Sequence, residues 1–181
     1  MRASRIADWT MCALMAAVTG VLAQLIIPIG PVPINMATLA VLIAGGLLGA
    51  KYGAVSLTVY LLLGAVGVPV FAGMGAGFGI LTGPTGGYIV GYIVMAWITG
   101  FSAERWGRRG LPLAAGMAAG TLALYTLGTA WFMFSRGMGL FASLMSCVFP
   151  FLPMDAVKIA AAAALVARVH RLLPARVGVG N

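Results

Sequence analysis

Residues 152–167 read Leu-Pro-Met-Asp-Ala-Val-Lys-Ile-Ala-Ala-Ala-Ala-Ala-Leu-Val-Ala, an apolar run with two opposite charges near its start. These charges, Asp155 and Lys158, are three residues apart and therefore share one face of a helix. An ionised side chain at the centre of a membrane helix is unfavourable by about 2.5–3.5 kcal/mol, so it is usually retained for a ligand, an ion or another charge. The run predicts a membrane helix that binds something polar near Asp155 and Lys158. The alternative to ligand binding is that the two charges only bind each other and fix the end of the helix.

The composition points to a membrane protein. Of the 181 residues, 62% are hydrophobic and 8% are charged, whereas about 25% of the residues in an ordinary soluble domain are charged. So few polar groups could not cover the surface of a soluble fold of this size, but lipid needs no such cover. We therefore predict one all-α integral membrane domain over residues 1–181.

Six apolar spans can be drawn, and several are at or below the roughly 20 residues that cross the hydrocarbon core. They cover residues 8–28, 35–50, 53–71, 84–103, 111–134 and 154–169. Only Lys51 and Tyr52 separate the second span from the third, so these two could instead form one re-entrant feature. The first span could be a secretory signal, because Arg2 and Arg5 precede it. Its apolar run continues to Ile29 and more spans follow, which favours a retained helix.

The basic residues fall mainly on one side of these six spans. With the N-terminus inside, nine of them lie on the cytoplasmic side and only Arg136 lies outside. The nine are Arg2, Arg5, Lys51, Arg105, Arg108, Arg109, Arg168, Arg171 and Arg176. This bias predicts that both termini are cytoplasmic. The net charge of +8 is therefore assigned to topology and to anionic lipid headgroups, and nucleic acid is not expected as a partner.

Two connections on the outer side are apolar, yet they are too rich in glycine and proline to be plausible helices. They are residues 30–35 and 71–88. Irregular backbone beside a bilayer needs hydrogen-bond partners, so such a segment folds onto protein or lines a cavity. We expect both to be lids over a pocket; the alternative for the glycine-rich segment is a tight turn with close helix packing. That segment fits neither a Gly-x-Gly-x-x-Gly pattern nor a Walker motif, so phosphate binding is rejected.

Small residues recur at every fourth position in several spans, a spacing that lets membrane helices approach closely. Gly45 with Gly49 and Gly53 is one example. Most of these sets are expected to serve internal packing. Ala13 and Ala17 could do the same, or they could form a docking face on the first helix for a membrane partner.

Four motifs occur in order along the chain. They are Gly30-Pro31-Val32-Pro33, Gly67-x-Pro69-Val70-Phe71-Ala72-Gly73, Gly83-Pro84-Thr85-Gly86-Gly87-Tyr88 and Pro150-Phe151-x-Pro153-x-Asp155-x-x-Lys158. Together they resemble the BioY family, the biotin-capturing S components of energy-coupling factor (ECF) transporters, from the first helix to the last. The resemblance implies a six-helix S-component bundle in the bacterial cytoplasmic (inner) membrane. It also implies a biotin pocket that opens to the outer face and lies under the connections after the first and third helices.

The resemblance also assigns residues. Asp155 and Lys158 match the family's charged residues at the start of the last helix, where a carboxylate can accept from the N–H groups of biotin and an ammonium can donate to it. The other expected pocket residues are Phe71, Met74, Phe78, Thr85, Gly86 and Tyr88. Met74 and Tyr88 stand where some relatives have an amide or a cation. The pair Ala13 and Ala17 is similar to the face by which S components meet a transmembrane coupling (T) subunit, which works with ATPase subunits.

Three other functions remain open. A transporter for another vitamin is the nearest, because S components share an architecture and differ in their pockets. A membrane protease would need a serine with a histidine, two aspartates or a metal site, but His170 lies at the inner boundary and Asp155 has no second acid beside it. We therefore expect no enzymatic activity, no catalytic residue, no metal and no cofactor. The third is an assembly protein without a ligand.

Overall fold

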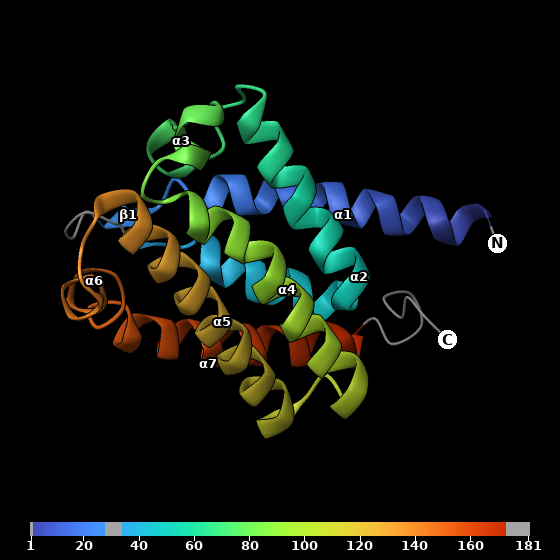
Figure 1. Ribbon diagram of the computed structural model, residues 1–181. Coiled ribbons are helices and arrows are strands. Elements are labelled where there is room, and N and C mark those ends of the chain that lie inside the picture. The colour runs from blue at the N-terminus through green and yellow to red at the C-terminus, as the bar shows by residue number, and fades with distance from the viewer. Residues whose placement is uncertain (1, 28–33, 173–181) are drawn as a thin grey trace.

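The computed structural model describes residues 2–27 and 34–172, with side chains described from Ile6 onward. Its described elements follow one another along the chain and are shown in Figure 1. They are α1 (Arg2–Leu22), β1 (Ile26–Ile27), β2 (Ile34–Asn35), α2 (Ala37–Ala65), η1 (Ala72–Met74), α3 (Phe78–Thr82), α4 (Gly86–Trp106), α5 (Gly110–Arg136), α6 (Leu140–Cys147) and α7 (Leu152–Leu172). The short strands β1 and β2 pair antiparallel, with Ile26 opposite Asn35.

Each of the six predicted spans falls on a helix, so the all-α prediction is confirmed. The second and third spans are the two parts of α2, which is broken at Gly49 (φ 82°, ψ −178°). Only glycine adopts such a φ readily. The second part begins where the Ala50 amide donates to Glu104 Oε1 at 3.0 Å. A carboxylate at the start of a helix satisfies an otherwise unpaired N–H and the helix dipole, which explains why the break occurs here.

The predicted small-residue packing is found on both sides of this break. A Cβ added to Gly53 would lie 3.0 Å from the Cα of Gly45, so the two parts of α2 touch through bare backbone. A Cβ at Gly100 of α4 would collide with Gly49 and Ala50. Helix α2 is consequently the centre of the bundle. It packs against α1, α4 and α7, while α5 packs against α4 and α7.

The apolar outer surface suits a lipid environment. Among the described residues, α2, α4 and α5 are long and apolar enough to cross a membrane, and α6 with α7, bent by 52° between them, qualify together as a further span. Large apolar side chains such as Trp97, Leu122 and Phe134 face outward. The chain is therefore a multi-pass membrane protein, while the count of six spans and the cytoplasmic side of the termini stay predictions.

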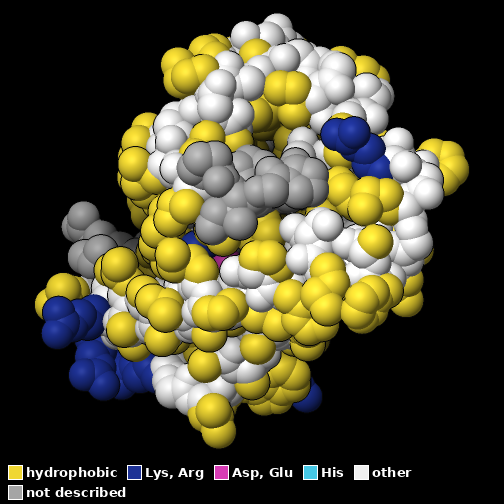
Figure 2. All heavy atoms as spheres, turned by 90° about the vertical axis from the view of Figure 1, so that its left-hand side faces the viewer, with side chains coloured by type: hydrophobic (Ala, Val, Ile, Leu, Met, Phe, Trp, Pro, Cys, Tyr) yellow, Lys and Arg dark blue, Asp and Glu magenta, His cyan; other side chains and the backbone are white. Residues whose placement is uncertain are grey.

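The two ends of the bundle differ. In Figure 1 the start of α1 and the end of α7 lie on one side, and the β1–β2 ribbon, α3 and α6 lie at the opposite end, here called the loop end. Figure 2 views the loop end, where acidic and basic side-chain atoms are visible in a narrow opening among hydrophobic ones.

One expectation about the connections needs correction. The glycine-rich segment was expected to contain no helix, yet it holds η1 and the five-residue α3. Gly77, with φ 93°, precedes α3 and Gly83 follows it, so a single helical turn satisfies backbone groups between two glycines. The structure thus combines short helical turns with the irregular backbone that the composition indicated. Residues 30–33 of the first connection lie outside the described residues.

Candidate functional site

The two charges that the sequence singled out form a buried ion pair at the start of α7. Lys158 Nζ lies 2.9 Å from Asp155 Oδ1, and the two residues are only 4% and 5% exposed. Pro153 is compatible with the first turn of a helix, where no intrahelical N–H is needed. Asp155 lies in that first turn, so its charge is favourably placed relative to the helix dipole.

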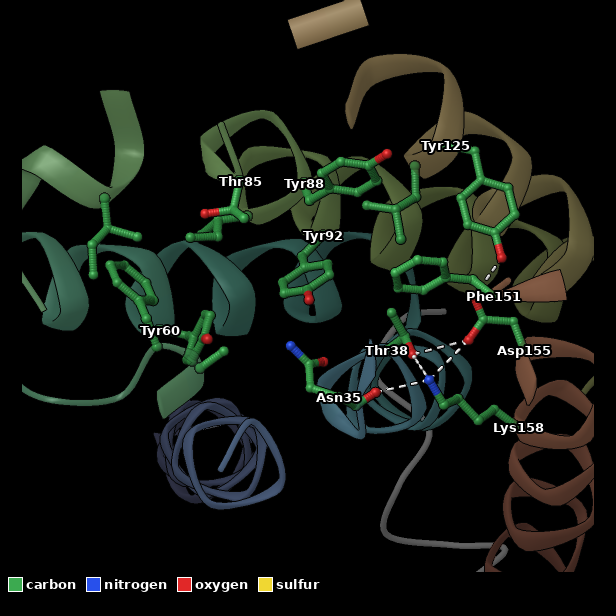
Figure 3. Close-up of a pocket in the computed structure, with 15 residues that line it drawn as sticks. Asn35, Thr38, Tyr60, Thr85, Tyr88, Tyr92, Tyr125, Phe151, Asp155 and Lys158 are labelled. Carbon is green, nitrogen blue, oxygen red and sulfur yellow. Dashed lines mark hydrogen bonds and ion pairs between the residues drawn. The ribbon is translucent and has the colours of Figure 1, made fainter. Parts of the chain in front are cut away.

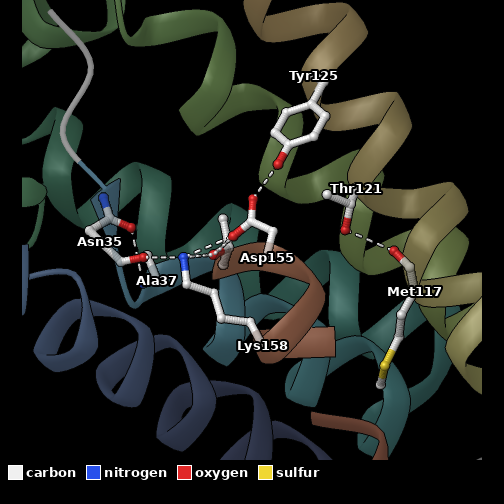
Figure 4. A network of polar contacts seen from close by, with 8 residues as sticks. Asn35, Ala37, Met117, Thr121, Tyr125, Asp155 and Lys158 are labelled. Atoms are coloured by element: carbon white, nitrogen blue, oxygen red, sulfur yellow. Dashed lines mark hydrogen bonds and ion pairs between the residues drawn. The ribbon is translucent and has the colours of Figure 1, made fainter. Parts of the chain in front are cut away.

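Lys158 connects α7 to the start of α2. Besides its contact with Asp155, its ammonium donates to the Asn35 carbonyl oxygen at 2.8 Å and to Thr38 Oγ1 at 2.9 Å. An ammonium has three N–H donors, so this geometry uses all of them. Asn35 also accepts from the Ala37 amide through Oδ1 at 3.0 Å, which satisfies one of the N–H groups left unpaired at the start of α2 (Figure 4). Lys158 would have to release a present partner in order to donate to a ligand.

Asp155 is held from a third helix. Tyr125 of α5 donates its hydroxyl to Asp155 Oδ2 at 2.5 Å, and Thr38 Oγ1 lies 3.5 Å from Oδ1. A carboxylate has about four acceptor positions, so Asp155 can still accept from a ligand without losing these contacts. Hydrogen bonding of this kind to both side chains offsets the free-energy cost of burying two charges. The pair therefore forms an ordered polar surface that can receive N–H donors.

This polar surface closes one end of a cavity of about 260 Å³. Asn35, Thr38, Tyr125, Asp155 and Lys158 form the polar end (Figure 3). The remaining walls are aromatic and aliphatic and come from α2, α4, α5, residues 71–85 and the turn before α7. Their aromatic members are Tyr60, Phe71, Tyr88, Tyr92 and Phe151. A concave apolar pocket with a few convergent polar groups is the usual form of a small-molecule site.

The aromatic wall is tightly packed. Tyr60 and Phe71 meet edge to face with ring centroids 5.6 Å apart, and Tyr60 and Tyr92 are 6.4 Å apart. Tyr88 exchanges a hydrogen bond with Thr129 at 3.2 Å. Its ring packs against Gly128 and occupies the space that a side chain at that position would need. The Tyr88 ring thus presents an apolar face to the cavity while its hydroxyl group remains paired.

Five of the eight predicted pocket residues line the cavity: Phe71, Thr85, Tyr88, Asp155 and Lys158. The other three, Met74, Phe78 and Gly86, are not among its lining residues. Met74 is 63% exposed and Phe78 is 69% exposed. Position 86 requires glycine because a Cβ there would collide with the Leu81 carbonyl oxygen. Contact of these three residues with a ligand stays a prediction.

Sequence reasoning missed Asn35, Thr38, Tyr60, Tyr92 and Tyr125. Polar aromatic residues inside apolar spans were an available signal, because Tyr88 and Tyr92 are one helical turn apart and both face the cavity. No comparable signal existed for Thr38, whose role depends on a lysine far along the chain.

The two alanines proposed for docking, Ala13 and Ala17, are both exposed on α1, whereas the neighbouring Ala16 is buried. They lie on the outer face of the bundle, away from the cavity residues. Their exposure means that internal packing does not use them.

The bundle and its polar and aromatic cavity define a multi-pass membrane protein with a small-molecule site near one end. Its fold is similar to that of a crystal structure of the S-component for biotin from an ECF-type ABC transporter, with a TM-score of 0.88, 29% sequence identity and 94% of both chains covered. The model of the BioY family matches residues 1–175. The chain belongs to the BioY family.

Named relatives agree with this membership. The chain is 36% identical to the probable biotin transporter BioY of Pyrococcus horikoshii over 89% of this chain and 94% of that protein. It is also 36% identical to the biotin transporter BioY of Rhizobium etli over 93% and 97% of the two chains. For the biotin transporter BioY of Thermotoga maritima the identity is 37%, over 81% and 85%. These relatives are described as transporters rather than enzymes.

Proposed function

We propose that this protein captures biotin for uptake, as the substrate-binding subunit of an ECF-type transporter in the cytoplasmic membrane. The observation that carries the proposal is the cavity itself, with the Asp155–Lys158 pair at one end and aromatic rings along its sides. The similarity to the S-component for biotin supports the choice of ligand.

The chemistry of the cavity suits the parts of biotin. The ureido ring carries two N–H donors, and Asp155 keeps about one acceptor position free after binding Lys158, Thr38 and Tyr125. The thiophane ring and the alkyl chain are apolar and match the aromatic and aliphatic walls. The cavity volume is slightly below the roughly 300–1,000 Å³ that is usual for ligand pockets, which fits a small vitamin.

Energy for transport is assigned to partner proteins. We propose that a T subunit docks on the exposed alanines Ala13 and Ala17 of α1, and that ATPase subunits act through it. Small residues allow the close helix approach that lipid-embedded association needs. A leucine at either position would keep the helix apolar but hold the partner away.

The test is equilibrium binding of labelled biotin to the purified chain in detergent. The wild type should bind tightly and release the label when unlabelled biotin is added, whereas Asp155→Asn and Lys158→Met should lose at least about a hundredfold in affinity. Asp8→Asn and Lys51→Met are matched controls, because they remove the same charges outside the cavity. If the folded wild-type protein bound another vitamin and not biotin, the ligand assigned to this site would be that other vitamin.

A further inference from the structure

Gln24, just beyond the end of α1, contacts a segment that lies more than forty residues further along the chain. Its Nε2, which carries two N–H groups, lies within hydrogen-bond distance of three carbonyl oxygens, those of Val70 at 3.3 Å, Phe71 at 3.1 Å and Gly20 of α1 at 3.0 Å. Its Oε1 accepts from the Met74 amide at 2.8 Å. One amide therefore binds both ends of the turn formed by residues 70–74.

This turn forms part of the cavity wall. Phe71 and Ala72 both line the cavity, and Phe71 is almost completely buried against Tyr60. Within the turn, Phe71 and Gly75 exchange backbone hydrogen bonds of 3.0 and 3.2 Å. Those bonds close the turn on itself, while Gln24 is what attaches its backbone to α1.

The turn also contains a conformation that needs outside support. Met74 has a φ of 57°, the one positive value among the described non-glycine residues. Such a backbone is unfavourable for a side chain like methionine and persists when its surroundings hold it in place. The hydrogen bond from the Met74 amide to Gln24 supplies this support at the strained residue itself.

We propose that Gln24 is a positioning residue for the ligand cavity: by fixing residues 70–74 on the end of α1, it holds the Phe71 wall in place and slows the departure of the ligand. The inference rests on the proposed function for its ligand, biotin, but the attachment of the turn can be measured without any ligand. Gln24 does not itself line the cavity, so its effect is transmitted through Phe71.

The first experiment is hydrogen–deuterium exchange of the ligand-free chain in detergent. Gln24→Met retains the length of the side chain and removes its hydrogen bonds, so peptides covering residues 70–77 should exchange faster than in the wild type. Peptides from α7 should be unchanged. Val21→Ala, one helical turn earlier and 68% exposed, is the control and should leave both regions unaffected. Unchanged exchange at residues 70–77 in Gln24→Met would overturn the proposal whether or not biotin binds.

The second experiment measures biotin association and dissociation separately. Loss of these hydrogen bonds should raise the dissociation rate constant about tenfold, with a much smaller change in the association rate constant. A variant that was merely less well folded would instead bind in a smaller fraction, with the wild-type dissociation rate. Faster exchange without faster dissociation would also overturn the proposal.

Gln24→Glu offers a second variant, because it keeps an acceptor for the Met74 amide but places a charged oxygen next to the carbonyl groups of Val70 and Phe71. This repulsion should make its dissociation at least as fast as that of Gln24→Met. If Gln24→Met does not fold, the same two measurements are made on Gln24→Glu. A wild-type chain that ignores biotin would refute the proposed function, and the exchange result would still decide whether Gln24 holds the turn.

Discussion

The two ends of the ligand cavity are held in place by different interactions. At the start of α7, buried charges are fixed by side chains from three helices, with every Lys158 donor in use. At residues 70–77, by contrast, the wall is an irregular turn with one exposed and two half-buried glycines, attached through backbone hydrogen bonds and one amide side chain. We propose that the charged end provides ligand recognition and a rigid reference, while the turn is the part that can open at low energetic cost.

The largest expected effect comes from breaking the buried pair. Asp155→Asn leaves the ammonium of Lys158 buried without a counter-charge, which is expected to lower the free energy of unfolding by about 3–5 kcal/mol. Denaturant unfolding in detergent measures this loss. The double variant Asp155→Asn/Lys158→Met, which has no buried charge, should be more stable than Asp155→Asn alone. A double variant as unstable as the single one would show that packing, and not charge, fixes this end.

A smaller effect is expected from Tyr125→Phe, which removes one hydrogen bond to a charged group and keeps the ring. Such bonds contribute about 1.5–3 kcal/mol, so biotin affinity should fall roughly tenfold to a hundredfold. Equilibrium binding measures the change, and Tyr52→Phe is the control, because Tyr52 packs on Trp9 and is not among the lining residues of the cavity. Equal affinity in Tyr125→Phe would mean that Asp155 needs no support from α5.

The smallest effect is expected at the turn. A Cβ at Gly64 would collide with the ring of Phe71, so Gly64→Ala should push Phe71 toward the cavity and weaken biotin binding by up to about tenfold, with an overpacking penalty of about 1–3 kcal/mol. Gly79→Ala is the control, because an added Cβ there meets no atom within 4 Å. An affinity loss larger than that of Tyr125→Phe would reverse the order proposed for the two ends.

The charged end was predictable from the sequence because ionised residues in an apolar helix are rare and visible as such. Its partners were not, since Asn35, Thr38 and Tyr125 are brought to Asp155 and Lys158 by helix packing and carry no local pattern that pairs them. Hydropathy placed each of the six predicted spans on a helix, although α1 ends at Leu22, before the predicted end at residue 28, and the second and third spans are the two parts of α2. The exact break in α2 depends on Glu104, which belongs to another helix. For Met74 and Phe78, the composition of the segment indicated a lid but could not tell which side chains face inward.

The position of Gly49 has a consequence for the shape of the cavity. Thr38, at the polar end, lies in the part of α2 before the break, and Tyr60, in the aromatic wall, lies in the part after it. The two walls are thus the two arms of one bent helix, joined at Gly49, which is not among the residues that line the cavity. The angle at this single glycine sets how far apart the arms stand, so the width of the cavity is determined at the other end of the bundle, where Glu104 holds the bend.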